Sequence, residues 1–333
     1  MIDLSTIWAG LLALSIFIYV ILDGFDLGIG VIFPFLDNDD DRAIAMNSVA
    51  PVWDGNETWL ILGGGGLFAA FPLAYAIIMP ALYAPFIAMI LALVFRGVAF
   101  EYRWRDKRHE KTWDRAFHFG SFVATFMQGI VLGAFIQGIE VEGRAYAGGW
   151  WDWASPFTFT CGLALTAGYA LLGSTWLIMK TENGLRDRAY AIAKNTGRAT
   201  LLFIGIVSIW TPFLSPKIAA QWLSFPHIFF VLPVPILTLV LAAITAWGLT
   251  KRKDNVPFLA TIGLFGLCFA GLGIGVTPYI VPHVITIQQA AAPDVSLSFM
   301  LVGALIFLPL ILGYTAYSYW VFRGKIDPKA GYH

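Results

Sequence analysis

The chain has 333 residues, of which 58% are hydrophobic and only 13% are charged, and its 21 basic residues equal its 21 acidic ones. An average soluble domain has about 25% charged residues, so this composition excludes both a soluble globular protein and a disordered one. The apolar residues occur in blocks of about twenty, each long enough to cross the roughly 30 Å hydrocarbon core of a bilayer. The sequence predicts an all-α integral membrane protein, with no soluble domain and no charge excess that would favour nucleic acid.

Nine blocks qualify as transmembrane helices, so residues 1–333 are predicted to form a single polytopic membrane domain. The first block lacks a basic N-terminal region and is too long for a cleaved signal peptide. The predicted spans cover 6–27, 54–76, 80–101, 116–139, 156–179, 199–216, 226–249, 256–280 and 297–321.

The basic residues lie almost entirely on one side of these spans. Counted over alternate connections, 18 of the 21 fall on one side and two, Arg144 and Lys217, fall on the other, while Arg96 lies inside a span. Because basic loops stay in the cytoplasm, we expect the N-terminus outside and the C-terminus cytoplasmic. The basic loops would also suit a surface for anionic lipid, although their role in orientation explains them without one.

Six ionisable residues fall within the first three predicted spans, all in the third of the bilayer nearest the cytoplasm. They are Asp23, Asp26, Asp54, Glu57, Arg96 and Glu101. Each costs roughly 2.5–3.5 kcal/mol to insert, so each calls for an explanation. The first four form two i,i+3 pairs, and each pair therefore shares one helical face.

Five of these residues are acids and only one is a base. One carboxylate can pair bidentately with the Arg96 guanidinium, and the others must be hydrated or protonated. Proton uptake requires a row of such ionisable groups that leads from the cytoplasm into the membrane. A structural interpretation remains open: Asp54 and Glu57 resemble a capped helix start, and Asp26 could end a helix in head-group water.

The five histidines lie at depths that do not favour a metal or haem site made by this chain alone. His109 and His118 are expected at the inner surface, His227 and His283 at the outer one, and His333 at the C-terminus. We interpret them as ordinary interfacial or loop residues, and we predict no metal site and no haem ligated solely by this chain.

Four consecutive glycines, residues 63–66, lie in the middle of the second predicted span. They could form an unwound stretch, as in secondary transporters, or a flat surface against which a helix or a planar ligand packs. Close packing is the favoured interpretation. A proton-coupled secondary transporter would need a matching interruption in a second half of the chain, and only one is visible.

Several segments resemble subunit II of the cytochrome bd quinol oxidases, a group that includes the cyanide-insensitive oxidases. The resemblance extends over the whole chain and is strongest in the first hundred residues. The matching segments are DGFDLGIG at 23–30, NSVAPVWDGNETWL at 47–60, GGGLFAAFP at 64–72, FRGVAFEYR at 95–103 and ILGYTAYSYW at 311–320.

The resemblance implies a fold of two four-helix bundles plus one peripheral helix, in a bacterial inner membrane. It implies a haem-bearing subunit I as partner, often a small accessory subunit, and haems b and d ligated by the partner. Such a complex oxidises quinol and reduces dioxygen to water, taking protons from the cytoplasm. Some members also hold a quinone in this subunit in a structural role.

The resemblance also assigns roles to residues. Asp54 occupies the position given to a proton pathway, with Asp23, Asp26, Glu57, Arg96 and Glu101 as its neighbours. The alternative is a purely structural oxidase subunit in which these acids only cap or pair.

Overall fold

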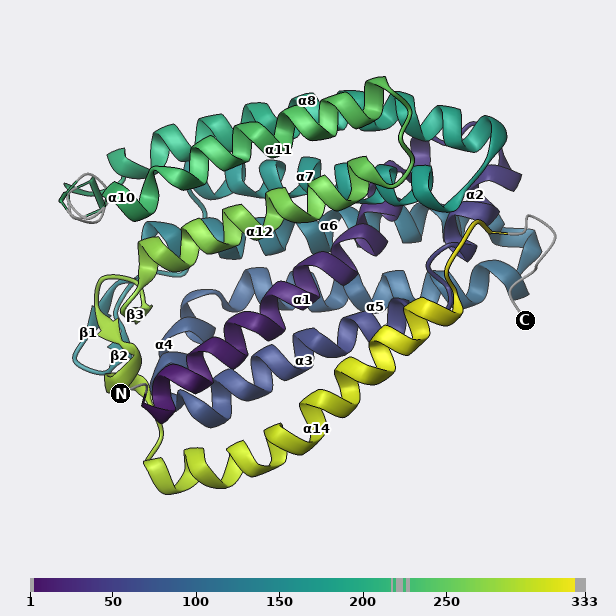
Figure 1. The fold of residues 1–333 in the computed structure, drawn as a ribbon. Coiled ribbons are helices and arrows are strands. Elements are labelled where there is room, and N and C mark those ends of the chain that lie inside the picture. Colours follow the sequence, from purple (N-terminus) through teal and green to yellow (C-terminus); the bar gives the residue numbers. More distant parts are fainter. Residues whose placement is uncertain (1–2, 217, 220–223, 226–227, 327–333) are drawn as a thin grey trace.

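The computed structural model describes residues 3–216, 218–219, 224–225 and 228–326. These residues form an all-helical molecule with two small β-hairpins (Figure 1). Eight helical segments are long and apolar enough to cross a membrane. The prediction of a multi-pass, all-α protein is therefore confirmed.

The secondary structure is as follows. The long helices are α1 (Leu4–Ile32), α3 (Trp53–Ala70), α5 (Tyr83–Arg105), α6 (Glu110–Gln137), α7 (Pro156–Lys180), α8 (Asn183–Trp210), α11 (Pro233–Thr250), α12 (Val256–Val276) and α14 (Asp294–Val321). The shorter helices are η1 (Phe33–Phe35), α2 (Asp39–Asn47), α4 (Pro72–Ala81), η2 (Lys107–His109), η3 (Thr211–Phe213), α10 (Ile228–Val231) and α13 (Ile287–Ala290). The antiparallel hairpins pair β1 (Val141–Glu142) with β2 (Ala145–Tyr146), and β3 (Tyr279–Val281) with β4 (Ile285–Thr286).

Some predicted boundaries are wrong for local reasons. The span 54–76 is not one helix: Phe71 has non-helical angles and Pro72 opens the separate helix α4, where its missing N–H is harmless. The helix α8 begins at Asn183 instead of residue 199. Its first half is too polar to be recognised as a membrane span, but one face of it is buried through residues such as Leu185 and Ala189. Residues 226–227, at the start of the span predicted at 226–249, lie outside the described residues.

The glycine run at 63–66 is helical and lies within α3. The interpretation as an unwound stretch is therefore wrong. A Cβ on Gly66 would lie 2.5 Å from Leu12 of α1, so this glycine allows close packing, whereas a Cβ on Gly64 or Gly65 would meet no atom within 4 Å. The packing interpretation thus holds for one side of the run, and the other side is open in this chain.

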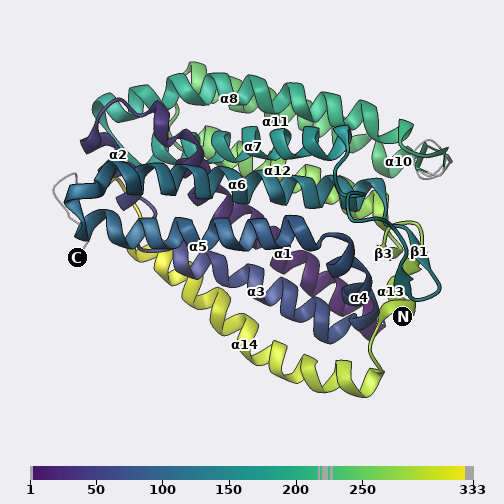
Figure 2. The same ribbon diagram turned by 180° about the vertical axis from the view of Figure 1, so that it is seen from behind.

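The helix α1 lies at the centre of the molecule, with α3, α6 and α7 packed around it (Figures 1 and 2). It approaches α7 backbone to backbone: a Cβ on Gly28 would lie 1.9 Å from the carbonyl oxygen of Tyr169, and one on Gly173 would lie 2.5 Å from the carbonyl carbon of Gly28. Small residues permit this approach, which packing in a membrane favours. The contact fixes the depth and rotation of the acidic part of α1.

The helix α14 lies at the edge of the molecule and is anchored near its ends (Figure 1). Near its start, the Trp8 indole donates a hydrogen bond to the carbonyl oxygen of Leu297 at 3.0 Å. Just beyond its end, Lys180 Nζ donates to the carbonyl oxygen of Phe322 at 2.6 Å. All residues of α14 are described, and Leu297 is the only one of them that is buried.

A polar clasp holds the segment that follows α14. Lys325 Nζ donates hydrogen bonds to Asp254 Oδ2 at 2.8 Å and to the carbonyl oxygen of Thr181 at 2.9 Å. Asp254 also accepts a hydrogen bond from the Tyr190 hydroxyl at 2.9 Å and pairs with Arg186 at 3.3 Å. The clasp therefore joins the segment after α14 to α7, α8 and the α11–α12 connection.

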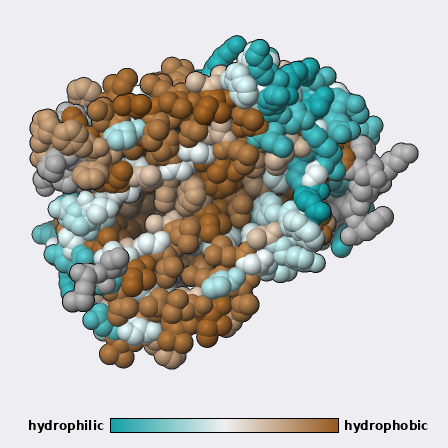
Figure 3. All heavy atoms as spheres, in the orientation of Figure 1, coloured by the Kyte–Doolittle hydropathy of each residue, from teal (hydrophilic) through white to brown (hydrophobic). Residues whose placement is uncertain are grey.

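The two ends of the molecule differ in chemistry. Hydrophilic residues gather mainly at the end that carries α2 and the α11–α12 connection, smaller hydrophilic patches lie at the opposite end, and a broad hydrophobic zone covers the face between them (Figure 3). Both α1 and α14 run toward that hydrophilic end (Figure 1). Among the basic residues that predict the orientation, Lys217 and Lys329 lie outside the described residues.

Candidate functional site

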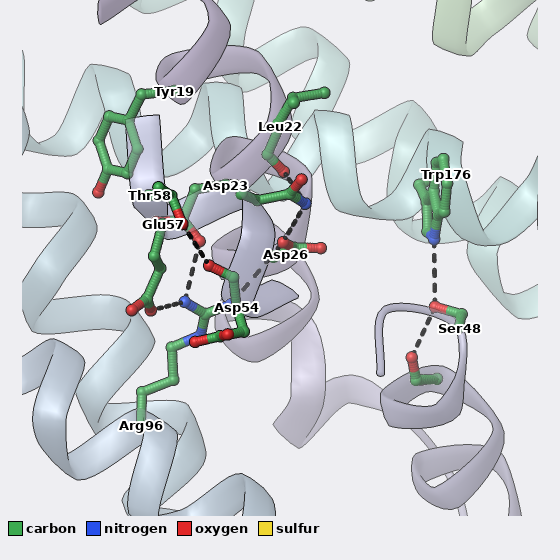
Figure 4. A network of polar contacts seen from close by, with 12 residues as sticks. Tyr19, Leu22, Asp23, Asp26, Ser48, Asp54, Glu57, Thr58, Arg96 and Trp176 are labelled. Atoms are coloured by element: carbon green, nitrogen blue, oxygen red, sulfur yellow. Dashed lines mark hydrogen bonds and ion pairs between the residues drawn. The ribbon is translucent and has the colours of Figure 1, made fainter. Parts of the chain in front are cut away.

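A buried arginine forms the centre of a charged cluster between α1, α3 and α5 (Figure 4). Arg96 of α5 has no exposed surface. Its Nη1 donates to Asp23 Oδ1 of α1 at 2.9 Å and to Glu57 Oε1 of α3 at 2.5 Å. Its Nη2 lies 4.0 Å from Asp26 Oδ2. One guanidinium thus faces three carboxylates from two other helices.

This arrangement differs from the predicted bidentate pair. A single nitrogen, Arg96 Nη1, serves both Asp23 of α1 and Glu57 of α3. The Arg96 guanidinium also lies 5.8 Å from the centre of the Trp53 ring, within the range of a cation–π contact.

Asp26 is connected to the last helix through an asparagine. Asn56 Nδ2 donates to Asp26 Oδ2 at 2.7 Å, and the hydroxyl of Tyr319 in α14 donates to Asn56 Oδ1 at 2.9 Å. Sequence reasoning missed both Asn56 and Tyr319. Asn56 stands between two predicted site residues, Asp54 and Glu57, whereas nothing near Tyr319 in the sequence signals its contact.

The interpretation of these acids as helix caps is wrong for the residues at which it was made. Asp26 has no exposed surface, and α1 continues past it to Ile32, so it does not end a helix in head-group water. The N-cap of α3 is Val52, which makes no side-chain capping bond. Asp54 lies in the first turn of α3, where a carboxylate suits the positive end of the helix dipole.

Asp54 and Glu101 flank the cluster without belonging to its central ion pairs. Asp54 is exposed on the surface of the chain, yet close enough to Glu57 for their like charges to interact. Glu101 is partly exposed and lies five residues beyond Arg96 on α5. The structure therefore brings four predicted residues into one cluster, and Asp54 and Glu101 lie outside its ion pairs.

Tight contacts hold the segment that precedes α3. The Trp176 indole of α7 donates to Ser48 Oγ at 3.2 Å, and the Ser48 hydroxyl donates to the carbonyl oxygen of Ala45 at 2.6 Å (Figure 4). Trp176 also stacks on Phe25 of α1, with ring centres 4.2 Å apart. These contacts set where α3 begins, and hence where Asp54 and Glu57 lie.

A second ion-pair cluster lies nearer the hydrophilic end and was not predicted. Arg103 of α5 is fully buried and pairs with Asp114 of α6 at 2.6 Å and with Glu110 at 3.0 Å. Arg42 of α2 lies 3.8 Å from Asp114. Counting charges in predicted loops could not find this cluster, since it depends on α5, α6 and α2 meeting in space.

A neutral polar bridge crosses the interior one turn from Asp23. Gln128 of α6 donates to the Tyr19 hydroxyl of α1 at 2.7 Å and accepts a hydrogen bond from the Tyr169 hydroxyl of α7 at 3.0 Å. Sequence reasoning missed these residues too, because tyrosine and glutamine in apolar spans are not distinctive by themselves. The bridge links α1, α6 and α7.

The described histidines each contact another part of this chain. His118 Nδ1 lies 2.9 Å from the carbonyl oxygen of Gly30, and His109 Nδ1 lies 2.9 Å from Asp106 Oδ2. His283 stands near Tyr279, and His227 and His333 lie outside the described residues. Within the described part of the chain, no group of three His, Cys, Asp or Glu residues could hold a metal ion.

Comparison with known proteins identifies the family. Residues 4–322 match the family model for cytochrome bd terminal oxidase subunit II. The chain is 30% identical to the cytochrome bd-I ubiquinol oxidase subunit 2 of Escherichia coli K12, over 98% of this chain and 96% of that protein. It is 28% identical to the cytochrome bd ubiquinol oxidase subunit 2 of Bacillus subtilis, over 99% and 98% of the two chains.

A solved structure agrees in fold. The bd oxidase of Geobacillus thermodenitrificans matches with a TM-score of 0.77 at 19% identity, over 96% of this chain and 98% of the other. The family match over residues 4–322 removes the basis for the transporter alternative. The chain belongs to the cytochrome bd terminal oxidase subunit II family and is a multi-pass subunit of a quinol-oxidising oxidoreductase complex.

Proposed function

We propose that this chain conducts protons from the cytoplasm toward the haem-bearing subunit I, and that it also serves as a scaffold for that subunit. The observation that carries the proposal is the fully buried Arg96, which faces the carboxylates of Asp23, Asp26 and Glu57 inside the membrane zone. Ionisable groups at such depth are expensive, and proton relays are one of the functions that retain them.

The geometry suggests how the proton path is arranged. Glu57 has a quarter of its side chain exposed and also contacts Arg96, so it connects the exposed Asp54 to the buried groups. Asp23 Oδ2 and Asp26 Oδ1 are buried and have no hydrogen-bond partner among the described residues. Buried polar atoms are normally satisfied, so each oxygen calls for a proton or a bridging water. Glu101 would extend the path toward the basic end of α5.

We propose nine membrane crossings: the eight long apolar helices and, in addition, α3. Its 18 residues rise about 27 Å, close to the thickness of the hydrocarbon core. Since α1 and α14 run in the same direction, the number of crossings is odd. We place the N-terminus outside and the basic end in the cytoplasm.

We group the nine helices, within one membrane domain of residues 1–333, as two four-helix bundles and a peripheral helix. The first bundle contains α1, α3, α5 and α6. The second contains α7, α8, α11 and α12, and α14 is peripheral. The contacts of α5 with α6, α1 with α3, α7 with α8, and α11 with α12 support this grouping, and equally extensive contacts of α1 and α6 with α7 join the two bundles.

The complex is proposed to lie in the bacterial inner membrane, to oxidise ubiquinol as its named relatives do, and to reduce dioxygen to water. His109 and His118 lie at or near the start of α6, and His283 lies in the turn between β3 and β4, so no described histidine stands in the middle of a membrane helix. We therefore assign haems b and d to subunit I. A structural quinone in this chain and a small accessory subunit stay predictions.

Asp54→Asn in the assembled complex tests the proton path. We expect quinol-oxidase turnover and proton uptake from the cytoplasmic side of proteoliposomes to fall, while the haem content per complex stays normal. Asp40→Asn, which changes an exposed acid of α2, is the matched control and should behave as the unmodified complex. Full turnover in an assembled Asp54→Asn complex refutes the proposal. A smaller yield of complex with normal activity per haem favours the purely structural subunit.

A further inference from the structure

A basic pocket lies at the hydrophilic end of α8, where α11 turns into α12. It has a volume of about 470 Å³, and its lining includes Lys194, Arg198, Arg252, Tyr190 and Leu249. Under the proposed topology this end faces the cytoplasm, the side on which basic pockets between membrane helices bind anionic lipid head groups.

The pocket holds more positive than negative charge. Arg252 pairs with Asp187 and lies over the Tyr190 ring, 5.0 Å from its centre. Lys194 and Arg198 are both exposed, and neither forms an ion pair within the described part of the chain. Arg198 makes only a long hydrogen bond, 3.4 Å, to the side-chain oxygen of Asn195. Two cations therefore remain available for an anionic ligand.

A shallow apolar groove of about 730 Å³ lies farther along α8, and the residues that line it, from Leu201 to Phe213, all belong to α8 or η3. Lys194, Arg198, Leu202, Gly205 and Ile209 follow one another at intervals of three or four residues, so they share one face of the helix. From Arg198 to Ile209 the helix rises about 16 Å, roughly half of the hydrocarbon core and hence the depth of one leaflet. A Cβ on Gly205 would meet no atom within 4 Å, so the middle of the groove is open.

We propose that the pocket and the groove form a binding site for one anionic phospholipid of the cytoplasmic leaflet. Its phosphodiester lies between Lys194 and Arg198, and an acyl chain follows the groove toward Ile209. Along α8 the two cations come first and the apolar groove follows them. A phospholipid has the same arrangement, with a negative head group followed by acyl chains as long as one leaflet is deep. A protein partner would not require this order.

The position of α8 supports a lipid-facing site. The Arg96 cluster, which under the proposed function faces subunit I, lies on α1, α3 and α5, whereas α8 packs mainly on α7 and also contacts α11. The proposed lipid site therefore lies on the side of the molecule away from the exposed Asp54. It does not depend on the proton path, and either proposal can fail alone.

Native mass spectrometry of the purified complex tests the site, with dioleoyl phosphatidylglycerol as the probe and dioleoyl phosphatidylcholine as the neutral comparison. Lys194→Gln combined with Arg198→Gln should weaken phosphatidylglycerol binding about 30-fold, since each basic residue near the surface contributes about 1 kcal/mol. Lys111→Gln with Arg115→Gln is the matched control: it removes two exposed basic residues with the same spacing from the start of α6. The control should leave binding unchanged.

A second variant tests the groove without changing charge. Gly205→Phe fills its middle and should weaken binding of phosphatidylglycerol, but not of the chain-free probe glycerophosphate. Equal losses in the double variant and its control, or equal binding of phosphatidylcholine, would overturn the proposal. So would the release of a bound polypeptide by the double variant, because that result assigns the pocket to a protein subunit. Haem content and monodispersity confirm that each variant assembles.

Discussion

Replacing Arg96 by methionine removes the cation that three buried or partly buried carboxylates share. The side chains are of similar size, so the change mainly removes charge and hydrogen bonds. At an effective dielectric constant of about 20, the contacts of Arg96 at 2.5, 2.9 and 4.0 Å correspond to roughly 4–7 kcal/mol of attraction each. Desolvation and repulsion between the acids offset most of this attraction.

The net loss is expected to be about 3–5 kcal/mol, the usual result when one partner of a buried ion pair is removed. This free energy changes the folding equilibrium by a factor of at least about 100. The assay is the thermal midpoint at which the detergent-solubilised complex loses its monodisperse peak in size-exclusion chromatography. We expect a clearly lower midpoint for Arg96→Met than for the unmodified complex.

A second substitution separates charge from packing. Arg96→Met combined with Asp23→Asn should recover part of the lost stability, because it removes one of the uncompensated buried charges. An unchanged midpoint in Arg96→Met, or a double variant that is less stable than the single one, would show that the cluster is not held together by charge.

Three further predictions concern other parts of the molecule. Gly28→Ala should destabilise the complex by about 1–3 kcal/mol and lower its thermal midpoint, since the added Cβ overlaps the backbone of α7. Gly10→Ala in the same helix is the control: its Cβ meets open space, so the thermal midpoint should stay unchanged or rise slightly. Partial burial raises the pKa of Asp254, but hydrogen bonds from Lys325 and Tyr190 outweigh it and hold the pKa below its usual 3.8. The clasp should therefore be intact at neutral pH and weaken as the pH falls through and below 3.8, seen as faster hydrogen exchange in residues 322–326; Asp254→Asn should abolish this pH dependence. Glu57→Gln keeps an acceptor for Arg96 but cannot carry a proton, so oxidase turnover should fall while the thermal midpoint changes little; unaffected turnover would exclude Glu57 from the path.

Much of the fold could be predicted because membrane spans have a strong local signal. Apolar blocks of the right length gave the long helices, and the rise per residue correctly placed Asp23, Asp26 and Glu57 at the depth of Arg96. The break before Pro72 was missed even though proline signals it, since hydropathy alone does not register a change in backbone angles.

The parts of the site that could not be predicted depend on contacts between distant segments. Tyr319 meets Asn56 across 263 residues, and Gln128 meets Tyr19 across 109. A sequence pattern reports what lies on one face of one helix, and it does not report which faces meet. The pattern also could not show that Arg96 Nη1 is shared by Asp23 and Glu57, because this too depends on which helix faces meet.

The anchoring of α14 near its ends has a consequence for the order of assembly. Its contacts at Leu297 and Phe322 join it to the chain's own first and middle helices, and the long exposed stretch between them makes few contacts with the rest of the chain. Both anchors lie within this chain, so α14 can dock on α1 and α7 before any other subunit arrives, while its exposed middle contributes little to that docking. Site-specific crosslinking of α14 during a time course of synthesis tests this order: the contacts at its two ends should form before any contact with another subunit.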